Sequence, residues 1–481
     1  MARRVAIIGG GLAGITSAIA LRDAGVEVTL LESRPWLGGA ASSFTRDEIV
    51  IDTGQHVFLR CCSYYQELLA RLGVTGSVTI QDRFDVTVLS PEAGPARLRR
   101  SSLPSPLHLS RALLSYPLLS LAERAKVGRA ALAFRLADPR SPGLDNHRLG
   151  AWLARRGQDE GARRRLWDLF IVSALNIDGD EASVPLAATV IKTALLGRND
   201  AADIGIATVP LGQLHSAAPA DLLARIGADV RYGARVASVG RLEGGGFRVV
   251  LTEGRTGSYS AAEGFAVDEA SGAEASSIIT DAVIMAVPSG QAARLGATAG
   301  LSEAAAWDRL GSSPIVNVHV IYDRPVTSLP FVAAVDSPVQ WVFDKTMQAG
   351  VRAGQYLAVS LSAADRYVDM PTAALRELFL PALEQLFPAA ADARIIDFFV
   401  TRERRATFRQ EPGSGSLRPG AATSVPGLAL AGSWTDTGWP DTMEGAVRSG
   451  QNAAQVLIRE LSSLPSPSRT AGLDPARTGA S

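Results

Sequence analysis

A glycine-rich turn near the start of the chain limits the possible folds more than any other feature. Residues 5–8 (VAII) form a short apolar run, and the pattern Gly9-x-Gly11-x-x-Gly14 follows it. Residues 12–24 then show helical apolar spacing, and residues 26–31 (VEVTLL) have the pattern of a second strand. Strand, turn, helix and strand in this order predict a βαβ unit, and therefore an α/β fold with a buried parallel sheet.

The spacing of the three glycines suits a nucleotide pyrophosphate. Gly9 permits a tight turn, Gly11 lets backbone N–H groups approach the phosphates, and Gly14 allows the helix to pack closely on the strand. The helix opens with Leu12 and Ala13. Glu32 ends the second strand, where a carboxylate can accept hydrogen bonds from the adenosine ribose. The alternative is a glycine-rich turn followed by a solvated glutamate.

A second glycine pair directly follows this acid, in the stretch SRPWLGGAASSF (33–44). A glycine pair here would let the chain pass beneath a second phosphate or the ribityl chain of a flavin. Proteins that bind only NAD rarely need this second contact, so the pair favours FAD, although a surface turn is the simpler alternative. The predicted contacts in this stretch are Ser33, Arg34, Gly38, Gly39 and Ala40.

Composition excludes several classes of protein. The 48 basic and 48 acidic side chains balance, so no overall charge attracts nucleic acid. Cys61 and Cys62 are the only cysteines and are adjacent, which excludes a disulfide framework; we expect both to pack as small buried side chains. The five histidines are widely separated, so no metal site is expected. Without a signal-peptide layout or a long apolar run, we expect a cytoplasmic protein that could touch a membrane.

The rest of the chain mixes helices and strands. Residues 60–200 have a mostly helical pattern, and a Pro/Ser/Gly-rich tail over 463–481 is expected to be disordered. The other expectations are a hairpin over 228–252, a floppy loop over 253–277, and strands at 279–288, 314–322 and 355–361.

Five stretches spread over the chain resemble the phytoene desaturase and flavin amine oxidase superfamily. Within it, they are most similar to the squalene-associated FAD-dependent desaturase group, the hydroxysqualene dehydroxylases of hopanoid biosynthesis. The stretches are IDTGQHVFLRCCSYY (51–65), LFIVSALNIDGDEASV (169–184), PVQWVFDK (338–345), RERRATFR (402–409) and LAGSWTDTGWPDTMEGAVRSG (430–450).

The resemblance implies a fold and a reaction. It implies a discontinuous Rossmann-type FAD-binding domain (1–65, 205–300 and 420–462) with an inserted α+β substrate domain (66–204 and 301–419). The implied reaction removes the hydroxyl of hydroxysqualene, a long isoprenoid, to give squalene with hydride from reduced flavin. An oxidative flavoenzyme, such as a carotenoid-type desaturase or an amine oxidase, is the main alternative. A lipid-binding escort protein without redox chemistry is a more remote one.

The resemblance also implies where the flavin ring lies. It places Gly54, Gln55 and His56 beside the ring, and the backbone of Val236 against the adenine. His56 could donate a proton to the leaving hydroxyl, or it could hydrogen-bond Asp52 and hold the loop. Two other candidate proton donors are Asp436 and Asp441. Four aromatic residues could stabilise a substrate cation or simply pack in the core, namely Trp341, Phe343, Trp434 and Trp439.

A second helix-opening turn begins at Gly432. Asp441 and Glu444 have the spacing of a capping box, and the resemblance directs the helix N-terminus at the flavin. The further contacts it implies are Ser433, Thr442, Met443, Glu444 and Ala446. Most of the superfamily has an acid where this chain has Ser433, so we expect weaker FAD binding, which Ser433→Asp should tighten.

Residues 103–134 form the most leucine-dense stretch, and basic residues flank it. A nearly insoluble hydrocarbon substrate would have to be collected from a bilayer. This segment could therefore lie in the membrane interface, or it could be a helical cap on the substrate domain. The two interpretations are compatible.

Overall fold

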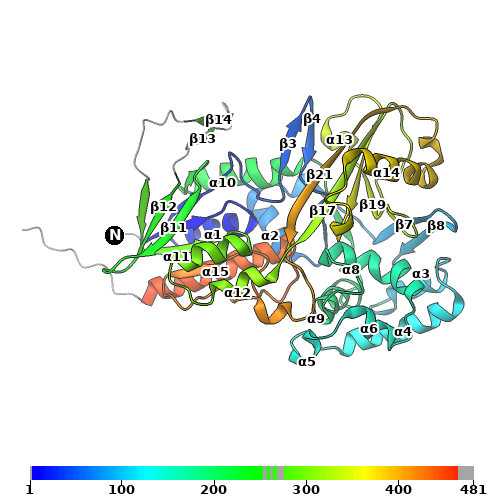
Figure 1. The fold of residues 1–481 in the computed structure, drawn as a ribbon, viewed down its shortest axis with the longest axis horizontal. Helices are drawn as coiled ribbons and strands as arrows, with labels where there is room; N and C mark the ends of the chain where they lie inside the picture. Colours follow the sequence, from blue (N-terminus) through cyan, green and yellow to red (C-terminus); the bar gives the residue numbers. More distant parts are fainter. Residues whose placement is uncertain (1–2, 253–256, 261–263, 268–275, 464–481) are drawn as a thin grey trace, which may run out of the picture.

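The computed structural model describes residues 3–252, 257–260, 264–267 and 276–463. One lobe is built on a five-stranded, all-parallel sheet with strand order β10-β2-β1-β16-β22 (Figure 1). Its strands are β1 (Arg4–Ile8), β2 (Glu27–Leu31), β10 (Asp229–Arg231), β16 (Ala282–Met285) and β22 (Leu428–Leu430). The chain therefore leaves this sheet and returns to it repeatedly. The predicted βαβ unit is confirmed, with α1 (Leu12–Asp23) between β1 and β2.

Two helices that follow strands of this sheet pack against each other. The helix α15 (Met443–Ser463) follows β22 and lies on α1 (Figure 1). The Ser17 hydroxyl donates to the carbonyl of Gly450 at 3.0 Å. A Cβ at Gly450 would lie 2.3 Å from the Ala13 carbonyl oxygen, so only glycine permits this approach. Because both helices follow parallel strands, both begin near the carboxyl edge of the sheet, where such folds bind ligands.

The second lobe contains a seven-stranded sheet with order β21-β17-β20-β19-β18-β7-β8, antiparallel except where β18 meets β7. The helix α14 (Thr372–Leu386) packs on it through Phe379 and Leu383. The strands are β7 (Asp85–Ser90), β8 (Gly94–Arg99), β17 (Ser313–Tyr322), β18 (Phe331–Ala334), β19 (Trp341–Asp344), β20 (Gln355–Leu361) and β21 (Ile395–Thr407). The predicted strands at 314–322 and 355–361 are confirmed as β17 and β20.

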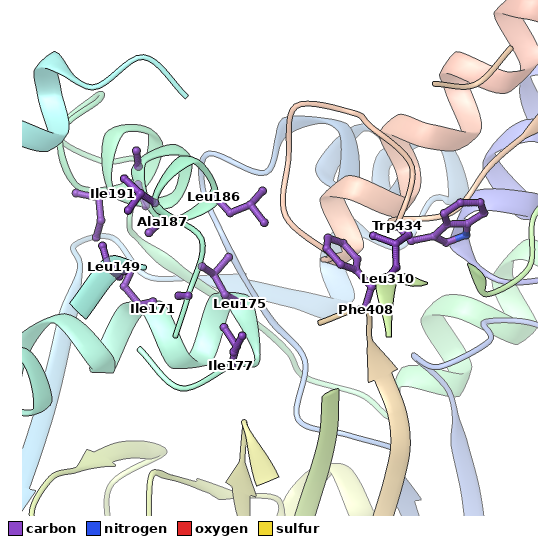
Figure 2. Packing of buried hydrophobic residues seen from close by; sticks show 14 of the residues in the cluster. Leu149, Ile171, Leu175, Ile177, Leu186, Ala187, Ile191, Leu310, Phe408 and Trp434 are labelled. Atoms are coloured by element: carbon purple, nitrogen blue, oxygen red, sulfur yellow. The ribbon is translucent and has the colours of Figure 1, made fainter. Parts of the chain in front are cut away.

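A group of helices continues the second lobe. The longest is α4 (Leu121–Leu136), and the others are α3 (Ser110–Leu114), α5 (Pro142–Asp145), α6 (Leu149–Ala154), α7 (Glu160–Ala162), α8 (Asp168–Leu175) and α9 (Val184–Val190). One hydrophobic cluster joins these helices to the parallel-sheet lobe. Figure 2 shows it running from Leu149 and Ile191 to Leu310, Phe408 and Trp434.

Smaller elements connect the two lobes. The strands β5 (Val57–Leu59), β9 (Ile204–Ala207) and β6 (Val78–Ile80) form one small sheet, and β3 (Ser43–Arg46) pairs with β4 (Ile49–Asp52). The remaining α-helices are α2 (Ser63–Leu72), α10 (Ala218–Arg225), α11 (Ser289–Thr298), α12 (Ala304–Trp307) and α13 (Thr346–Ala349). The predicted domain boundaries stay a prediction.

Several expected elements differ from the structure. The helical prediction for 60–200 is wrong over 78–99, which forms β6, β7 and β8. The hairpin predicted over 228–252 is only β11 (Val236–Arg241) with β12 (Phe247–Leu251), because 229–231 joins the parallel sheet as β10. The stretch 279–288 contributes to two strands, β15 (Ser277–Thr280) and β16.

The loop predicted over 253–277 contains two short strands, β13 (Gly257–Ser260) and β14 (Gly264–Val267), which pair with each other. The rest of that loop, except residues 276 and 277, lies outside the described residues, as does the tail beyond Ser463.

Candidate functional site

The first glycine turn has the geometry that its spacing predicts. Gly9 has φ +107°, and a Cβ there would lie 2.2 Å from the Ala286 carbonyl oxygen. A Cβ at Gly14 would lie 1.9 Å from the Gly9 carbonyl oxygen. A Cβ at Gly11 would meet only Gly39 Cα, at 3.9 Å, so space remains in front of the helix. Gly9 and Gly14 therefore serve packing, whereas Gly11 keeps the N-terminus of α1 open.

Glu32 connects this turn to the segment that follows β2. Its buried carboxylate accepts the backbone N–H of Gly10 at 2.7 Å, the N–H of Arg34 at 2.7 Å and the Ser33 hydroxyl at 3.1 Å. A carboxylate has about four lone-pair sites, so one remains for a ribose hydroxyl. The segment before Val236 also lies here, since the Ala234 N–H donates to the Glu32 carbonyl at 2.8 Å.

The glycine pair lies on top of the first turn. The Gly38 N–H donates to the Gly10 carbonyl at 2.9 Å, and the Arg34 guanidinium donates to the Gly39 carbonyl at 3.1 Å. Gly38 and Gly39 have φ +98° and +59°, which glycine adopts without strain. Among the described residues, no side chain caps α1 at Gly11. An uncapped helix N-terminus inside a glycine cradle fits the pyrophosphate of a dinucleotide.

The second turn is built differently from the prediction. Gly432 has φ +138°, and its N–H donates to the Ser449 hydroxyl at 2.8 Å. Thr442 caps α15, because its hydroxyl accepts the Gly445 N–H at 3.2 Å. The predicted capping box of Asp441 and Glu444 is therefore wrong. Met443 and Ala446 lie in the first turn of α15, and their predicted contact with the flavin stays a prediction.

Both acids of the expected capping box have distant partners. The Asp441 carboxylate accepts the Phe408 N–H at 2.8 Å, and the Ser433 hydroxyl hydrogen-bonds it. Burial raises the pKa of Asp441. Glu444 accepts the N–H of Tyr65 at 2.8 Å at the start of α2, and it pairs with Arg448 at 2.8 Å. Glu444 therefore caps α2, which the sequence did not indicate.

Arg418 holds the loop of the second turn, and no motif marked it. Its buried guanidinium donates to the backbone carbonyls of Ser433 at 3.2 Å, Trp434 at 3.2 Å and Trp439 at 2.8 Å, as well as to that of Thr435. Burial lowers the pKa of Arg418. A lone arginine before a Pro-Gly pair gives no sequence signal for this role.

Asp52 is the centre of a buried polar cluster near His56. Its carboxylate accepts the Ser43 hydroxyl at 2.7 Å and the Leu211 N–H at 2.9 Å. Lys345 Nζ lies 2.8 Å from Asp52 Oδ2, as an ion pair rather than a directed hydrogen bond. The alternative in which Asp52 hydrogen-bonds His56 is therefore wrong. Lys345 ends the stretch PVQWVFDK, but no sequence pattern marks it as a partner of Asp52.

His56 lies in a small cavity between the two lobes. The lining includes Gln55, Phe343, Lys345 and Gln348. His56 Nδ1 lies 3.1 Å from the Gly54 carbonyl oxygen, and burial lowers the pKa of the ring. The buried Gln55 side-chain nitrogen has no hydrogen-bond partner among the described residues. A buried donor without a partner fits a polar group of a ligand.

The four aromatic candidates separate into two groups. Phe343 lines the cavity and stacks on Trp341 at 6.3 Å between centroids, and the Trp341 indole donates to Ser173 at 2.8 Å. Trp434 is core, because its indole donates to the Val287 carbonyl at 2.9 Å (Figure 2). The Trp439 ring holds the Arg448 guanidinium at 4.6 Å. Of the four, Phe343 alone lines the cavity, and Trp341 stacks behind it.

The candidate proton donors also differ in their surroundings. Asp436 is exposed and accepts the Gly438 N–H at 3.1 Å, so it does not lie in a dry pocket. Asp441 is half-buried, and its carboxylate accepts the Phe408 N–H. Cys61 and Cys62 are partly buried free thiols that pack against the two largest hydrophobic clusters. In the part of the chain that the structure describes, no group of three or more His, Cys, Asp or Glu side chains could hold a metal ion.

Comparisons with known proteins agree with this architecture. The family model of flavin containing amine oxidoreductases matches residues 12–458. The chain is 28% identical to the hydroxysqualene dehydroxylase of Sinorhizobium fredii and 29% identical to that of Rhodopseudomonas palustris, covering at least 95% of this chain and 99% of each relative. The zeta-carotene desaturase of Synechocystis is 24% identical over 95% of this chain and 97% of its own length.

Solved structures share the fold. A putrescine oxidase has a TM-score of 0.71 at 19% identity, covering 95% of this chain and 99% of its own. The predicted fold class, a Rossmann-type domain with an inserted substrate domain, is therefore confirmed. The family match makes the protein an oxidoreductase with a flavin, and the dinucleotide-binding turn makes the cofactor FAD. The chain belongs to the flavin containing amine oxidoreductases.

Proposed function

We propose that this enzyme is a hydroxysqualene dehydroxylase, which converts hydroxysqualene to squalene. The main support is its similarity to two proteins of that name over 99% of their length. The stacked pair of Phe343, which lines the cavity, and Trp341 behind it adds apolar aromatic surface next to the polar groups of Gln55 and His56. Substrate and product both belong to isoprenoid and hopanoid biosynthesis.

The reaction makes definite demands on the protein. The substrate carbon gains a hydride, and the hydroxyl gains a proton and leaves as water. Reduced FAD, when bound, supplies the hydride. The residues that would hold it are the two glycine turns, Glu32 and the N-terminus of α15. The protein itself must exclude bulk water, orient the hydroxyl and supply the proton.

The structure changes the role proposed for His56. Burial lowers the pKa of the ring, so it is neutral near pH 7. The Gly54 carbonyl can only accept, so Nδ1 carries the ring proton and Nε2 is left as an acceptor. His56 is thus better suited to accept a hydrogen bond from the substrate hydroxyl than to protonate it. Asp441, whose pKa is raised by burial, stays a candidate for the proton donor, although its carboxylate accepts the Phe408 N–H and it does not line the cavity of His56.

Single-turnover chemistry tests the proposal. The purified flavoprotein would be reduced without oxygen, mixed with hydroxysqualene, and followed by flavin absorbance while squalene is measured by mass spectrometry. We expect the flavin to be reoxidised as squalene forms in equal amount. No squalene from fully reduced enzyme would overturn the proposal.

The second candidate is an oxidative desaturase, favoured by the similarity to zeta-carotene desaturases. Oxidised enzyme would then be reduced by a carotene, whereas a dehydroxylase would leave that substrate unchanged. A polyamine in the same assay tests for amine oxidase activity. Protein that stays colourless after FAD is added would instead indicate the escort-type alternative.

A further inference from the structure

Six leucines between residues 103 and 136 have largely exposed side chains. The exposed fractions are 44% for Leu103, 55% for Leu107, 69% for Leu114, 80% for Leu121, 57% for Leu132 and 75% for Leu136. We call these six residues the leucine face. Single exposed leucines are ordinary on protein surfaces, but clustered ones mark sites of interaction.

Helix α4 carries half of the leucine face, on the side opposite its core contacts. Leu121, Leu132 and Leu136 repeat with helical spacing and lie on one side of the helix. Val127, Ala130 and Phe134 are buried on the other side. The outer side of a surface helix is normally polar. The exposed leucines on the outer side of α4 are instead typical of a helix face that packs against another apolar surface.

The corner between α3 and α4 joins the two halves of the leucine face. The Arg124 guanidinium donates to the carbonyls of Leu114 at 2.7 Å and Leu119 at 2.8 Å. Ser120 and Glu123 form a capping box that fixes the start of α4. Leu114 and Leu121 therefore lie on either side of a well-supported corner. Figure 1 shows α3 and α4 far along the longest axis of the molecule from α1 and α15.

The segment that carries the leucine face has a local excess of positive charge. From 103 to 140 the basic residues are Arg111, Arg124, Lys126, Arg129, Arg135 and Arg140, whereas the acidic ones are Glu123 and Asp138. The whole chain has equal numbers of both signs, so this excess is local. Exposed leucines suit the acyl boundary of a bilayer, and exposed arginine and lysine suit anionic phospholipid headgroups.

We propose that the leucine face docks this enzyme on the surface of an anionic bilayer, with α4 lying in the interface. None of the helices in the described ranges is long and apolar enough to cross a bilayer, so the contact is one of surface binding. If the proposed function holds, docking would also bring the enzyme to the phase that holds its isoprenoid substrate.

Vesicle binding tests this proposal without any turnover. Sedimentation would be measured with vesicles of phosphatidylcholine alone and of phosphatidylcholine with phosphatidylglycerol, both free of isoprenoid. The test variant combines Leu121→Gln, Leu132→Gln and Leu136→Gln. Each exposed leucine that enters the interface favours binding, so we expect the variant to partition at least roughly tenfold less. The variant should keep its flavin and its thermal midpoint, because the three side chains are exposed.

Two controls make the result specific. The pair Leu378→Gln and Ile396→Gln removes exposed apolar side chains elsewhere and should leave binding unchanged. Arg129→Gln with Arg135→Gln should weaken binding only to the anionic vesicles, and added salt should have the same effect. Equal vesicle binding by the wild type and the leucine variant would overturn the proposal. The proposal would also be overturned if the wild type does not bind vesicles but forms a dimer, and the leucine variant is a monomer.

Discussion

At the scale of single residues, Ser433 and Asp441 act as a pair. The Ser433 hydroxyl lies close to the half-buried Asp441 carboxylate and stabilises its charged form. An aspartate at position 433 would bring a second carboxylate close to the first, and two neighbouring carboxylates disfavour each other's ionisation. From this proximity we predict the opposite of the expectation from the sequence: Ser433→Asp alone should weaken FAD binding by about tenfold or more. Fluorescence titration of the apoprotein with FAD measures this.

The exchanged pair is the matched variant. Ser433→Asp together with Asp441→Ser keeps one acid and one hydroxyl, so it should bind FAD more tightly than Ser433→Asp alone. Asp436→Ser removes an exposed acid from the same loop and serves as a control. Tighter binding by the single variant would show that the two side chains are not coupled.

Residues of the first site were predictable because they follow a recognisable pattern of strand, glycine turn, helix, strand and acid. The glycine spacing places the pyrophosphate turn, and Glu32 follows at the end of the next strand, where the structure has it. Arg418 and Lys345 were not predictable, since Arg418 binds backbone carbonyls, which no sequence pattern marks, and Lys345 pairs with Asp52 from a distant part of the chain. No local pattern distinguishes them from surface cations.

At the scale of elements, Glu444 connects two helices. It lies in the first turn of α15, yet it accepts the backbone N–H groups of Tyr64 and Tyr65 in α2 and pairs with Arg448. Glu444→Gln should lower the free energy of unfolding by about 1–3 kcal/mol, because a charged acceptor is lost from buried donors. Denaturant titration of the apoprotein measures this apart from cofactor binding. Glu67→Gln, on the exposed side of α2, should change little; equal effects of the two changes would contradict the capping role.

The wrong predictions at this scale share one cause. Asp441 and Glu444 have the spacing of a capping box, but tertiary partners bind both carboxylates instead. Residues 229–231 show the same alternation of apolar and polar side chains as the hairpin that follows, but they pair with β2 in the parallel sheet. Alternation indicates a strand and does not specify its neighbour. The strand pattern of residues 85–90 (DVTVLS) was visible, but the leucine-rich and arginine-rich sequence around it favoured helix.

At the scale of the whole molecule, buried histidines couple folding to pH. Burial lowers the pKa of His215 to about 4 and that of His319 to about 3. His56 and His108 shift in the same direction for the same reason. Unfolded histidine titrates near 6.5, so below that pH the unfolded chain binds more protons than the folded one. The stability these groups contribute is present above pH 6.5 and is lost as pH falls toward the folded pKa values. Asp168, whose pKa is raised to about 7, partly offsets this loss.

A difference measurement isolates one histidine from these opposing groups. His319 lies between the Tyr356 hydroxyl at 2.7 Å and the Thr401 hydroxyl at 3.0 Å, and a glutamine amide can also donate one hydrogen bond and accept another. Denaturation would be followed for wild type and His319→Gln from pH 8 to about pH 4. The difference in unfolding free energy should be constant above about pH 7 and should then shift in favour of the variant by about 1.4 kcal/mol per pH unit. Parallel curves across the range would contradict the prediction. They would mean that His319 has the same pKa in the folded and unfolded protein, and that the polar network around it accommodates the charge.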